Sequence, residues 1–363
     1  MNIALVHDAL INRGGAEQVL QVFCEMFPEA PIYTSAYLPE KTYSFFKNKK
    51  IVTSPLQKLV TSEDHLKLLF PLANYFMQRM EIKPCDIILS SSTFCAKHVS
   101  KIGVKHFCYC YTPFRLVWNP ESYATDLKAG IKIRLVRPLL PLFKKWDYHA
   151  AQKIYRFIAM TNETSERIKK YYHRESAILP PPIDYSKFCP GNGSSDYFLI
   201  VSRLEPYKKV DLVIKTFNEL KLPLKVVGGG TLSNELKKLA CPNVEFLGTV
   251  TNEELLSLYQ HCIAVILPQK EDYGIVPLEA NACGKPAICY GSGGVKTTMV
   301  PYTEENKDLA TAIFFYNQDE KSLTLAIDRL MTARFNRDAL IANTKRFGKQ
   351  EFCENLYKIL KLG

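Results

Sequence analysis

The stretch K-E-D-Y-G-I-V-P-L-E-A-N-A-C-G-K at residues 270–285 predicts a helix that starts just after a buried strand. The apolar run that precedes it, 263–267, is typical of a strand in a parallel sheet. Pro277 suits an early helical position, because its φ already fits and its missing N–H would have no partner there. The segment therefore predicts an α/β unit with a loop at the carboxyl end of a strand, where ligands bind in open α/β sheets.

The start of this predicted helix combines donors for an anion with two carboxylates. Gly274, Ile275 and Val276 present unpaired backbone N–H groups at the positive end of the helix dipole, which predicts an anion site. Glu271 precedes the helix, where an acid can hydrogen-bond a neutral polyol, and Glu279 lies inside the helix on the same side. A diphosphate between them, with sugar hydroxyls at one end and ribose at the other, is what an enzyme acting on a sugar nucleotide needs. The alternative is that two glutamates occur at this spacing by chance.

A second phosphate signal is the sequence V-S-R-L-E-P-Y-K-K-V-D at residues 201–211. It follows the β-rich run 197–201 and precedes a helical pattern, so Arg203 and Lys208 project from a loop between a strand and a helix. Arginine binds phosphate through a bidentate fork, and lysine acts as a point charge. The alternative is a pair of solvated cations on a surface loop.

The glycine pair Gly14-Gly15 lies between an apolar strand at 2–7 and an amphipathic helix at 16–27. Two residues without side chains allow another group to approach the backbone closely. The pattern is not G-x-G-x-x-G, so a nicotinamide-binding fingerprint is not supported. A simple turn is the alternative interpretation.

Apolar strand candidates alternate with helical patterns along the whole chain, which indicates parallel, doubly wound α/β sheets. With 363 residues the chain is long enough for two domains. The clearest break is the polar, turn-rich segment D-Y-S-K-F-C-P-G-N-G-S-S-D at 184–196. We therefore expect a first domain over 1–183, a linker over 184–196, a second domain over 197–347, and a final amphipathic helix over 348–363.

Three strings together carry a family resemblance: R-G-G-A-E-Q-V-L at 13–20, S-R-L-E-P-Y-K-K-V-D at 202–211, and E-D-Y-G-I-V-P-L-E-A at 271–280. They resemble the family-4 retaining glycosyltransferases, most closely the bacterial mannosyltransferase-like branch of O-antigen and exopolysaccharide synthesis. The resemblance implies the GT-B fold, in which two Rossmann-like domains face each other across a cleft. It also implies that the first domain binds the acceptor, the second binds the nucleotide sugar, and the final helix packs back on the first domain.

The resemblance assigns a role to each candidate residue of the donor site. It implies that Arg203 and Lys208 hold the donor diphosphate, that Glu271 contacts the sugar hydroxyls, and that Glu279 contacts the ribose. Gly14 and Gly15 would let a loop of the first domain approach the phosphates. We expect no metal and no cofactor, because the two cations and the helix terminus can neutralise the diphosphate of the co-substrate.

The chain departs from the family pattern on the acceptor side. The sequence Y-C-Y-T-P-F-R-L-V-W-N at 109–119 has Tyr111 where relatives usually have histidine, although His7, Asp8, Arg115 and Trp118 match the family. Thr297 stands where relatives often have glutamate, and 311–312 read T-A in place of T-G. We place Tyr111 among the catalytic candidates, although an unperturbed pKa of about 10 makes tyrosine a poor base near neutrality. Retaining transfer in this fold would not need a protein base if the leaving diphosphate oxygen accepts the proton of the acceptor.

The eleven cysteines are odd in number and lack the spacing of a disulfide framework, which favours free thiols in a reducing cytoplasm. Cys108 and Cys110 would share one face of a strand, but no histidine or cysteine cluster completes a metal site, so buried thiols are the favoured interpretation. The first ten residues lack a basic region and read as a strand, so we expect no signal peptide. No apolar run of 18 residues indicates a spanning helix.

Positive charge is concentrated in the first half of the chain. Residues 1–190 carry 26 Lys and Arg against 16 Asp and Glu, a net charge of +10. The whole chain has a net charge of +11, so residues 191–363 contribute only +1. The basic residues cluster with apolar ones at 43–80 and 132–153, a composition that suits an anionic membrane surface and a lipid-pyrophosphate acceptor. The alternative is a solvated basic face. Nucleic acid is disfavoured, since no binding module for it is recognisable.

Together with the composition and charge of the chain, the resemblance implies a cytoplasmic retaining glycosyltransferase on the inner face of the cell membrane. It would move a hexose, mannose from GDP-mannose, onto a lipid-linked saccharide for cell-surface polysaccharide. The alternative is a catalytically weak scaffold subunit that binds nucleotide sugar and partners another transferase.

Overall fold

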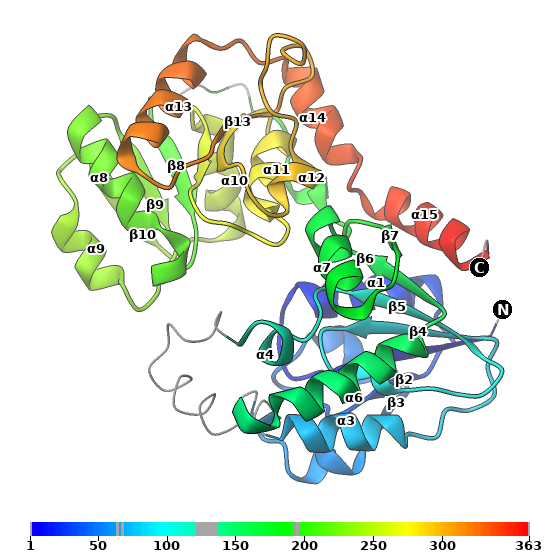
Figure 1. Cartoon of the computed structure of the whole chain (residues 1–363). Helices are drawn as coiled ribbons and strands as arrows, with labels where there is room; N and C mark the ends of the chain where they lie inside the picture. The colour runs from blue at the N-terminus through cyan, green and yellow to red at the C-terminus, as the bar shows by residue number, and fades with distance from the viewer. Residues whose placement is uncertain are drawn as a thin grey trace. The chain divides into compact units, whose positions relative to one another are not determined.

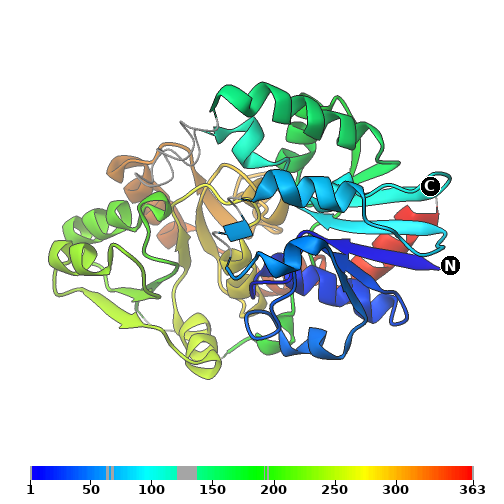
Figure 2. The ribbon, with the colours of Figure 1, turned by 90° about the horizontal axis from the view of Figure 1, so that it is seen from below.

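The computed structural model describes residues 2–62, 65–66, 69–120, 137–191, 193 and 196–361. The chain forms two compact units. Unit 1 comprises Met1–Pro181 together with Phe352–Gly363, and unit 2 comprises Pro182–Glu351. Figures 1 and 2 show helices on both faces of the sheet in each unit.

Unit 1 is built on a seven-stranded sheet of order β3-β2-β1-β4-β5-β6-β7, in which every pairing is parallel. Its strands are β1 Ile3–His7, β2 Ile32–Thr34, β3 Ile51–Thr53, β4 Ile87–Ser92, β5 Lys105–Cys110, β6 Arg156–Ala159 and β7 Ser176–Ile178. The helices include α1 Gly15–Met26, α3 Phe70–Gln78, α4 Arg115–Trp118, α6 Leu140–Gln152, α7 Asn162–Tyr172 and α15 Lys349–Lys361, with short 3₁₀ turns η1 Ser44–Asn48, η2 Pro55–Lys58, η3 Ala96–His98 and η5 Arg137–Leu139.

The last helix, α15, contributes to the core of unit 1. Phe352 stacks on Phe23 of α1 with 6.1 Å between ring centroids, and it meets Tyr109 of β5 edge-on at 5.9 Å. Burial of large aromatic rings on both sides accounts for this attachment, since each ring removes a large apolar area from water. Unit 1 therefore combines the first half of the chain with its last helix.

A buried ion pair ties the helices of unit 1 together. Lys97 of η3 lies 2.8 Å from Asp147 of α6, and both side chains are 2 % exposed. Asp147 also accepts hydrogen bonds from Trp118 and from Tyr172, each at 2.7 Å. Burial acts to raise the pKa of Asp147, but the charge of Lys97 and the contact with His98 outweigh it and hold that pKa below its usual range. Trp118, which matches the family pattern, is thus a structural residue in this unit.

Unit 2 has a six-stranded sheet of order β10-β9-β8-β11-β12-β13, also parallel throughout. Its strands are β8 Phe198–Val201, β9 Leu224–Val227, β10 Val244–Gly248, β11 Val265–Leu267, β12 Ala287–Tyr290 and β13 Ala312–Phe315. The helices include α8 Val210–Leu220, α9 Ser233–Leu239, α10 Asn252–His261, α11 Ile275–Ala282, α12 Val295–Thr298, α13 Glu320–Thr332 and α14 Arg337–Lys345, with 3₁₀ turns η6 Tyr185–Lys187 and η7 Pro206–Lys208.

Each sheet has a point at which the strand order reverses. In unit 2 the chain runs outward from β8 through β9 to β10, then returns to β11 on the other side of β8. In unit 1 the same reversal falls between β1 and β4. Open α/β sheets bind ligands in the crevice beside the carboxyl ends of such strands. The predicted class, two doubly wound Rossmann-like domains, is confirmed, and each sheet has one such reversal point.

Candidate functional site

The predicted donor residues lie just after the two strands that flank the reversal in unit 2. Arg203 and Lys208 follow β8, and Glu271 follows β11. β8 and β11 are hydrogen-bonded neighbours, with Leu199 paired to Val265. Because parallel strands end at the same edge of a sheet, loops that are far apart in sequence meet there.

Lys208 and Glu271 are in direct contact. The Lys208 ammonium pairs with Oε1 of Glu271, although the two residues are 63 positions apart. The side chain of Lys208 is 12 % exposed and that of Glu271 is 26 % exposed, so the pair is partly desolvated. A diphosphate that binds Lys208 would compete with this carboxylate for the same cation.

Arg203 is exposed and has its guanidinium held by a neighbour in the same loop. One terminal nitrogen donates to the hydroxyl of Tyr207 at 2.6 Å. No carboxylate of the described residues forms an ion pair with Arg203. Its charge is therefore available to an anion at the end of β8.

The helix start predicted from the sequence is present at α11. Gly274 is the residue before the helix, with a φ of 88° that only glycine adopts without strain. Ile275 and Val276 are the first two helical residues, and Pro277 is the third and is buried. The first N–H groups of a helix have no intrahelical partner, so this terminus offers donors to an anion.

A second glycine pair holds the acidic loop in place. Gly294 donates its backbone N–H to the carbonyl of Glu271 at 2.7 Å. A Cβ on Gly293 would lie 2.2 Å from the same carbonyl oxygen, and one on Gly294 would lie 2.3 Å from the carbonyl of Asp272. Any side chain at either position would displace the loop. In the sequence, the pair of glycines after an apolar strand could have indicated this packing against the acidic loop, but we predicted no role for it.

Gln269 is a site residue that the sequence analysis missed. It is 2 % exposed, and its amide nitrogen donates to Oε1 of Glu271 at 2.7 Å. The side-chain oxygen of Gln269, Oε1, is buried without a hydrogen-bond partner among the described residues. Lys208 and Gln269 thus share one oxygen of Glu271, which leaves its other oxygen for a ligand. A single glutamine carries no pattern that could have marked it.

A third loop borders the residues that follow β8. The glycines at 228–230 follow β9, and a Cβ on Gly230 would lie 2.4 Å from the carbonyl of Leu204. Thr231 donates its backbone N–H and its hydroxyl to the carboxylate of Glu205, at 3.1 and 2.7 Å. This loop packs against the backbone beside Arg203. Three consecutive glycines after an apolar strand could have indicated such a close approach, but the sequence analysis did not predict it.

Glu279 lies in the second turn of α11 and is held by another helix. Oε2 of its carboxylate accepts a hydrogen bond of 2.6 Å from the hydroxyl of Tyr259 in α10. Burial raises the pKa of Glu279, and the hydrogen bond from Tyr259 acts in the opposite direction. Tyr259 was also missed, because nothing in the sequence around it distinguishes it from an ordinary core tyrosine.

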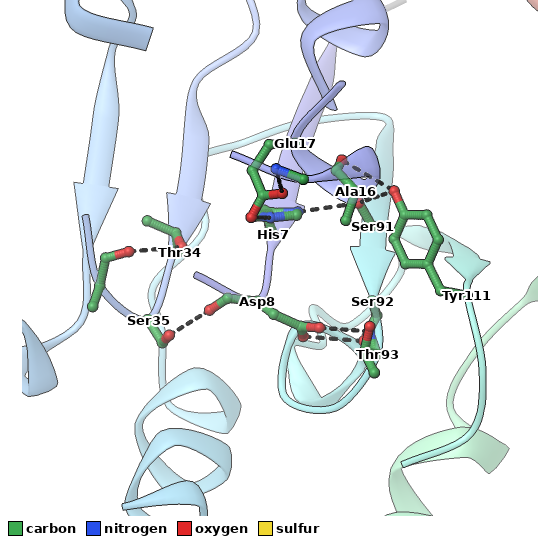
Figure 3. A network of polar contacts seen from close by, with 12 residues as sticks. His7, Asp8, Ala16, Glu17, Thr34, Ser35, Ser91, Ser92, Thr93 and Tyr111 are labelled. Atoms are coloured by element: carbon green, nitrogen blue, oxygen red, sulfur yellow. Dashed lines mark hydrogen bonds and ion pairs between the residues drawn. The ribbon is translucent and has the colours of Figure 1, made fainter. Parts of the chain in front are cut away.

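The reversal point of unit 1 holds a polar network that contains Tyr111 (Figure 3). His7 Nδ1 lies 3.0 Å from the hydroxyl of Ser91, which lies 2.9 Å from the hydroxyl of Tyr111. The Tyr111 hydroxyl donates to the carbonyl of Ala16 at 3.1 Å. Burial raises the pKa of Tyr111 well above its usual value, so the hydroxyl stays protonated at neutral pH and is not a base. Its catalytic role stays a prediction.

The Gly14-Gly15 loop is anchored by a carboxylate of α1. The backbone N–H of Gly14 donates to Oε2 of Glu17 at 3.0 Å, and the other oxygen of Glu17 lies 3.8 Å from His7 Nε2. A Cβ on Gly14 would lie 3.0 Å from Glu17, whereas nothing lies within 4 Å of one on Gly15. The open space at Gly15 suits the approach of another group, and the predicted contact with donor phosphates stays a prediction.

Asp8, another residue that matches the family pattern, is committed to the backbone. Its carboxylate accepts from the N–H groups of Phe94 at 3.0 Å and Ala96 at 2.7 Å, and from the hydroxyl of Ser92 at 3.2 Å. These bonds fix the turn that follows β4. Asp8 therefore fixes the backbone at the reversal point of unit 1.

Replacing Tyr111 by histidine is expected to preserve or raise turnover. The variant restores the residue usual in relatives, and the phenol it removes is protonated and acts as a hydrogen-bond donor to Ala16. The measurement is the rate of sugar transfer by wild type and Tyr111→His at equal concentration. Efficient turnover by the wild type that Tyr111→His abolishes would show that the tyrosine has a specific role in the reaction.

The part of the chain that the structure describes contains no cluster of three or more side chains able to hold a metal ion. It also contains no helix that is both long and apolar enough to cross a membrane. Cys108 and Cys110 are buried, and burial raises the pKa of Cys108 to about 12, so this thiol stays neutral.

Comparison with known families places the candidate donor site inside a recognised domain. Residues 187–347 match the model of the family described as glycosyl transferases group 1. The matched segment lies in unit 2 and includes Arg203, Lys208, Glu271 and Glu279. Over this segment, unit 2 is therefore similar to the glycosyl transferases group 1.

Two curated relatives illustrate the range of the sequence similarity. The chain is 26% identical over 225 residues to the D-inositol 3-phosphate glycosyltransferase of Geodermatophilus obscurus, covering 53% of this chain and 48% of the relative. It is 30% identical over 172 residues to the GDP-mannose-dependent monoacylated alpha-(1-6)-phosphatidylinositol monomannoside mannosyltransferase of Corynebacterium glutamicum, covering 39% and 45%. The chain spans about half the length of the curated relatives that it matches.

Solved structures match the chain over its full length. Sucrose-phosphate synthase from Thermosynechococcus elongatus superposes with a TM-score of 0.73 at 13% identity, covering 100% of this chain and 99% of that one. Anabaena HepE in complex with UDP and glucose superposes with a TM-score of 0.65 at 16% identity, covering 99% of each chain. These likenesses show the fold, that of the GT-B glycosyltransferases.

Proposed function

We propose that this chain, whose second unit is similar to the glycosyl transferases group 1, is a retaining glycosyltransferase that moves a hexose from a nucleotide sugar to a lipid-linked saccharide. The observation that carries the proposal is the contact between Lys208 and Glu271 at the reversal point of the unit 2 sheet. A cation for phosphate and an acid for hydroxyls meet there, beside the start of α11 and within the segment that matches the family model.

The largest electrostatic demand of the reaction is the charge that develops on the leaving diphosphate. Arg203, Lys208 and the N-terminal N–H groups of α11 are donors that the fold has already placed, so they can stabilise that charge with little reorganisation. In the proposed reaction the leaving oxygen takes the proton of the acceptor hydroxyl as the new glycosidic bond forms. A protonated Tyr111 is compatible with this scheme, because no protein base is required.

GDP-mannose is the donor we propose. The supporting observation is that the Corynebacterium relative, at 30% identity, is described as GDP-mannose-dependent. A thermal-shift screen of GDP, UDP, ADP and their sugars tests the choice, since a ligand that binds the folded state raises Tm. GDP and GDP-mannose should give the largest shifts. Larger shifts with UDP and UDP-glucose would exclude the proposed donor.

The proposed acceptor is lipid-linked, which requires the protein to work at a cytoplasmic, anionic membrane surface. Leu139, the last residue of η5, and Leu142, in the first turn of α6, are 50% and 63% exposed and lie close in sequence to the cations Lys144 and Lys145. Apolar side chains beside lysines suit an anionic interface. Residues 132–136 of the predicted basic stretch lie outside the described residues.

The other predicted basic stretch, at 43–80, has part of its charge engaged within the protein. Lys47 pairs with Glu40 at 2.8 Å, and Lys49 lies 4.9 Å from the centre of the Phe45 ring. Exposed ion pairs are weak, so these lysines can still exchange partners at a charged surface.

Replacing Arg137, Lys144 and Lys145 by glutamate is expected to weaken binding to anionic liposomes, and so is the same change at Lys47, Lys49 and Lys50. Each cation near an anionic surface contributes on the order of 1 kcal/mol, an effect that decays within a Debye length of about 8–10 Å. Co-sedimentation measures the binding, which should need anionic lipid and fall as salt rises. The affinity for soluble nucleotide serves as the control and should not change. A wild type that fails to bind anionic liposomes even at low salt would show a merely solvated basic face.

A further inference from the structure

Tyr259 is the residue through which α10 reaches the candidate donor site. Its side chain is fully buried, and its ring meets Phe188 edge-on with 5.6 Å between centroids. Its hydroxyl donates to Oε2 of Glu279 at 2.6 Å. Because the two residues belong to different helices, the bond fixes the carboxylate relative to both of them.

This hydrogen bond occupies one oxygen of Glu279 and leaves the other. Within the described part of the chain, Oε1 of Glu279 makes no hydrogen bond, and the residue is half-buried. An ionised carboxylate only accepts hydrogen bonds, so Oε1 is suited to a hydroxyl donor. A carboxylate that is already held in one orientation loses less freedom when that donor arrives.

We propose that Tyr259 is a positioning residue of the donor site, which orients Glu279 so that Oε1 accepts a hydrogen bond from a ribose hydroxyl of the bound nucleotide. The inference rests on the proposed function and deepens it. To the ribose contact already expected of Glu279 in α11, it adds a supporting residue from α10.

The electrostatics of the pair support this role. Burial raises the pKa of Tyr259 well above its usual value, so the hydroxyl stays protonated and donates. Burial also raises the pKa of Glu279, and the bond from Tyr259 counteracts that rise. The other titratable groups that act on this pair are the thiols of Cys262 and Cys283, which are neutral because burial raises the pKa of each to about 12.

The sign of the pH dependence follows from these directions. The ionised form of Glu279 is the better acceptor, so ribose recognition is present above its pKa and is lost as the pH falls through it. Removing the Tyr259 hydroxyl removes the interaction that lowers this pKa. In Tyr259→Phe the loss of ribose recognition should therefore occur at a higher pH than in the wild type.

The test compares GDP with 2′,3′-dideoxy-GDP by calorimetry. The wild type should prefer GDP by about tenfold or more, the scale of a hydrogen bond to a charged group. Tyr259→Phe, which keeps the ring, should lose most of this preference while its affinity for the dideoxy nucleotide stays close to that of the wild type. As the pH is lowered, the preference for GDP that remains in Tyr259→Phe should disappear at a higher pH than the preference of the wild type does.

Tyr197→Phe is the matched control. The Tyr197 hydroxyl donates to the carbonyl of Leu258, the residue next to Tyr259 in α10, and has no hydrogen bond to Glu279. The same loss of a buried tyrosine hydroxyl should leave the preference for GDP unchanged. In a Glu279→Gln background, Tyr259→Phe should have no further effect on the preference, because its action passes through the carboxylate.

Three results would overturn the inference. Equal weakening of GDP and dideoxy-GDP by Tyr259→Phe would show a purely structural role, and an unchanged preference would show no role in ribose recognition. In both cases the wild type still binds GDP, so the proposed function survives. A wild type that binds neither GDP nor UDP would contradict the proposed function, and this inference would fall with it.

Discussion

Replacing Arg203 or Lys208 by alanine is expected to slow sugar transfer by about 30- to 1,000-fold, or roughly 2–4 kcal/mol of transition-state stabilisation. Each residue supplies a preplaced positive charge at the carboxyl end of β8, where the leaving diphosphate develops its negative charge. Nucleotide binding should weaken as well, because the product carries the same diphosphate. Initial rates with the sugar nucleotide and calorimetry with the bare nucleotide measure the two effects.

The controls separate charge from folding. Lys215→Ala removes an exposed cation from α8, the helix that follows the same loop, and should leave the rate unchanged. Lys208→Met keeps much of the side-chain volume but leaves Glu271 without its ion-pair partner, so a comparison of Tm with the wild type reports any structural cost. Near-wild-type turnover in both Arg203→Ala and Lys208→Ala would remove these residues from the site.

Replacing the two glutamates by glutamine is expected to separate sugar recognition from ribose recognition. Glu271→Gln should damage transfer more than it damages binding of the bare nucleotide, because Glu271 is proposed to contact the sugar. Glu279→Gln should weaken the binding of the bare nucleotide as well, by about 1.5–3 kcal/mol, because a hydrogen bond to a charged group is lost. Calorimetry with nucleotide and with sugar nucleotide gives both affinities.

Glu219→Gln provides the matched control for these variants. Glu219 is exposed on α8, away from the acidic loop in sequence, and its neutralisation should change neither affinity. A loss of bare-nucleotide affinity in Glu271→Gln but not in Glu279→Gln would mean that the two roles are reversed.

The central strands of both sheets could be predicted because parallel strands are buried on both faces and read as apolar runs. β8 and β9 illustrate this, since their burial is almost complete. Three strands of unit 1 were not predicted: β2 Ile32–Thr34, β3 Ile51–Thr53 and β7 Ser176–Ile178. Each is only three residues long, too short to stand out as an apolar run, and each is defined by its hydrogen bonds to a neighbouring strand, which no local pattern records.

The candidate site divides in the same way between local and long-range features. Gly274 and Pro277 mark the start of α11 through backbone geometry, which the sequence expresses directly. The contacts of Gln269 with Glu271 and of Tyr259 with Glu279 depend on packing between separate segments. They could not be inferred from residue type or spacing, because a buried glutamine or tyrosine has the same local sequence whether or not it supports a carboxylate.

The measurement that tests the proposed function most directly is the anomeric configuration of a transferred sugar. The purified chain would be incubated with the sugar nucleotide that stabilises it most and with lipid-linked saccharides extracted from bacterial membranes, and the product would be analysed by NMR. We predict acceptor-dependent release of nucleoside diphosphate and a new linkage that keeps the configuration of the donor, both strongly reduced in Lys208→Met. Tight nucleotide binding without turnover on any acceptor, or a product with inverted configuration, would contradict the account.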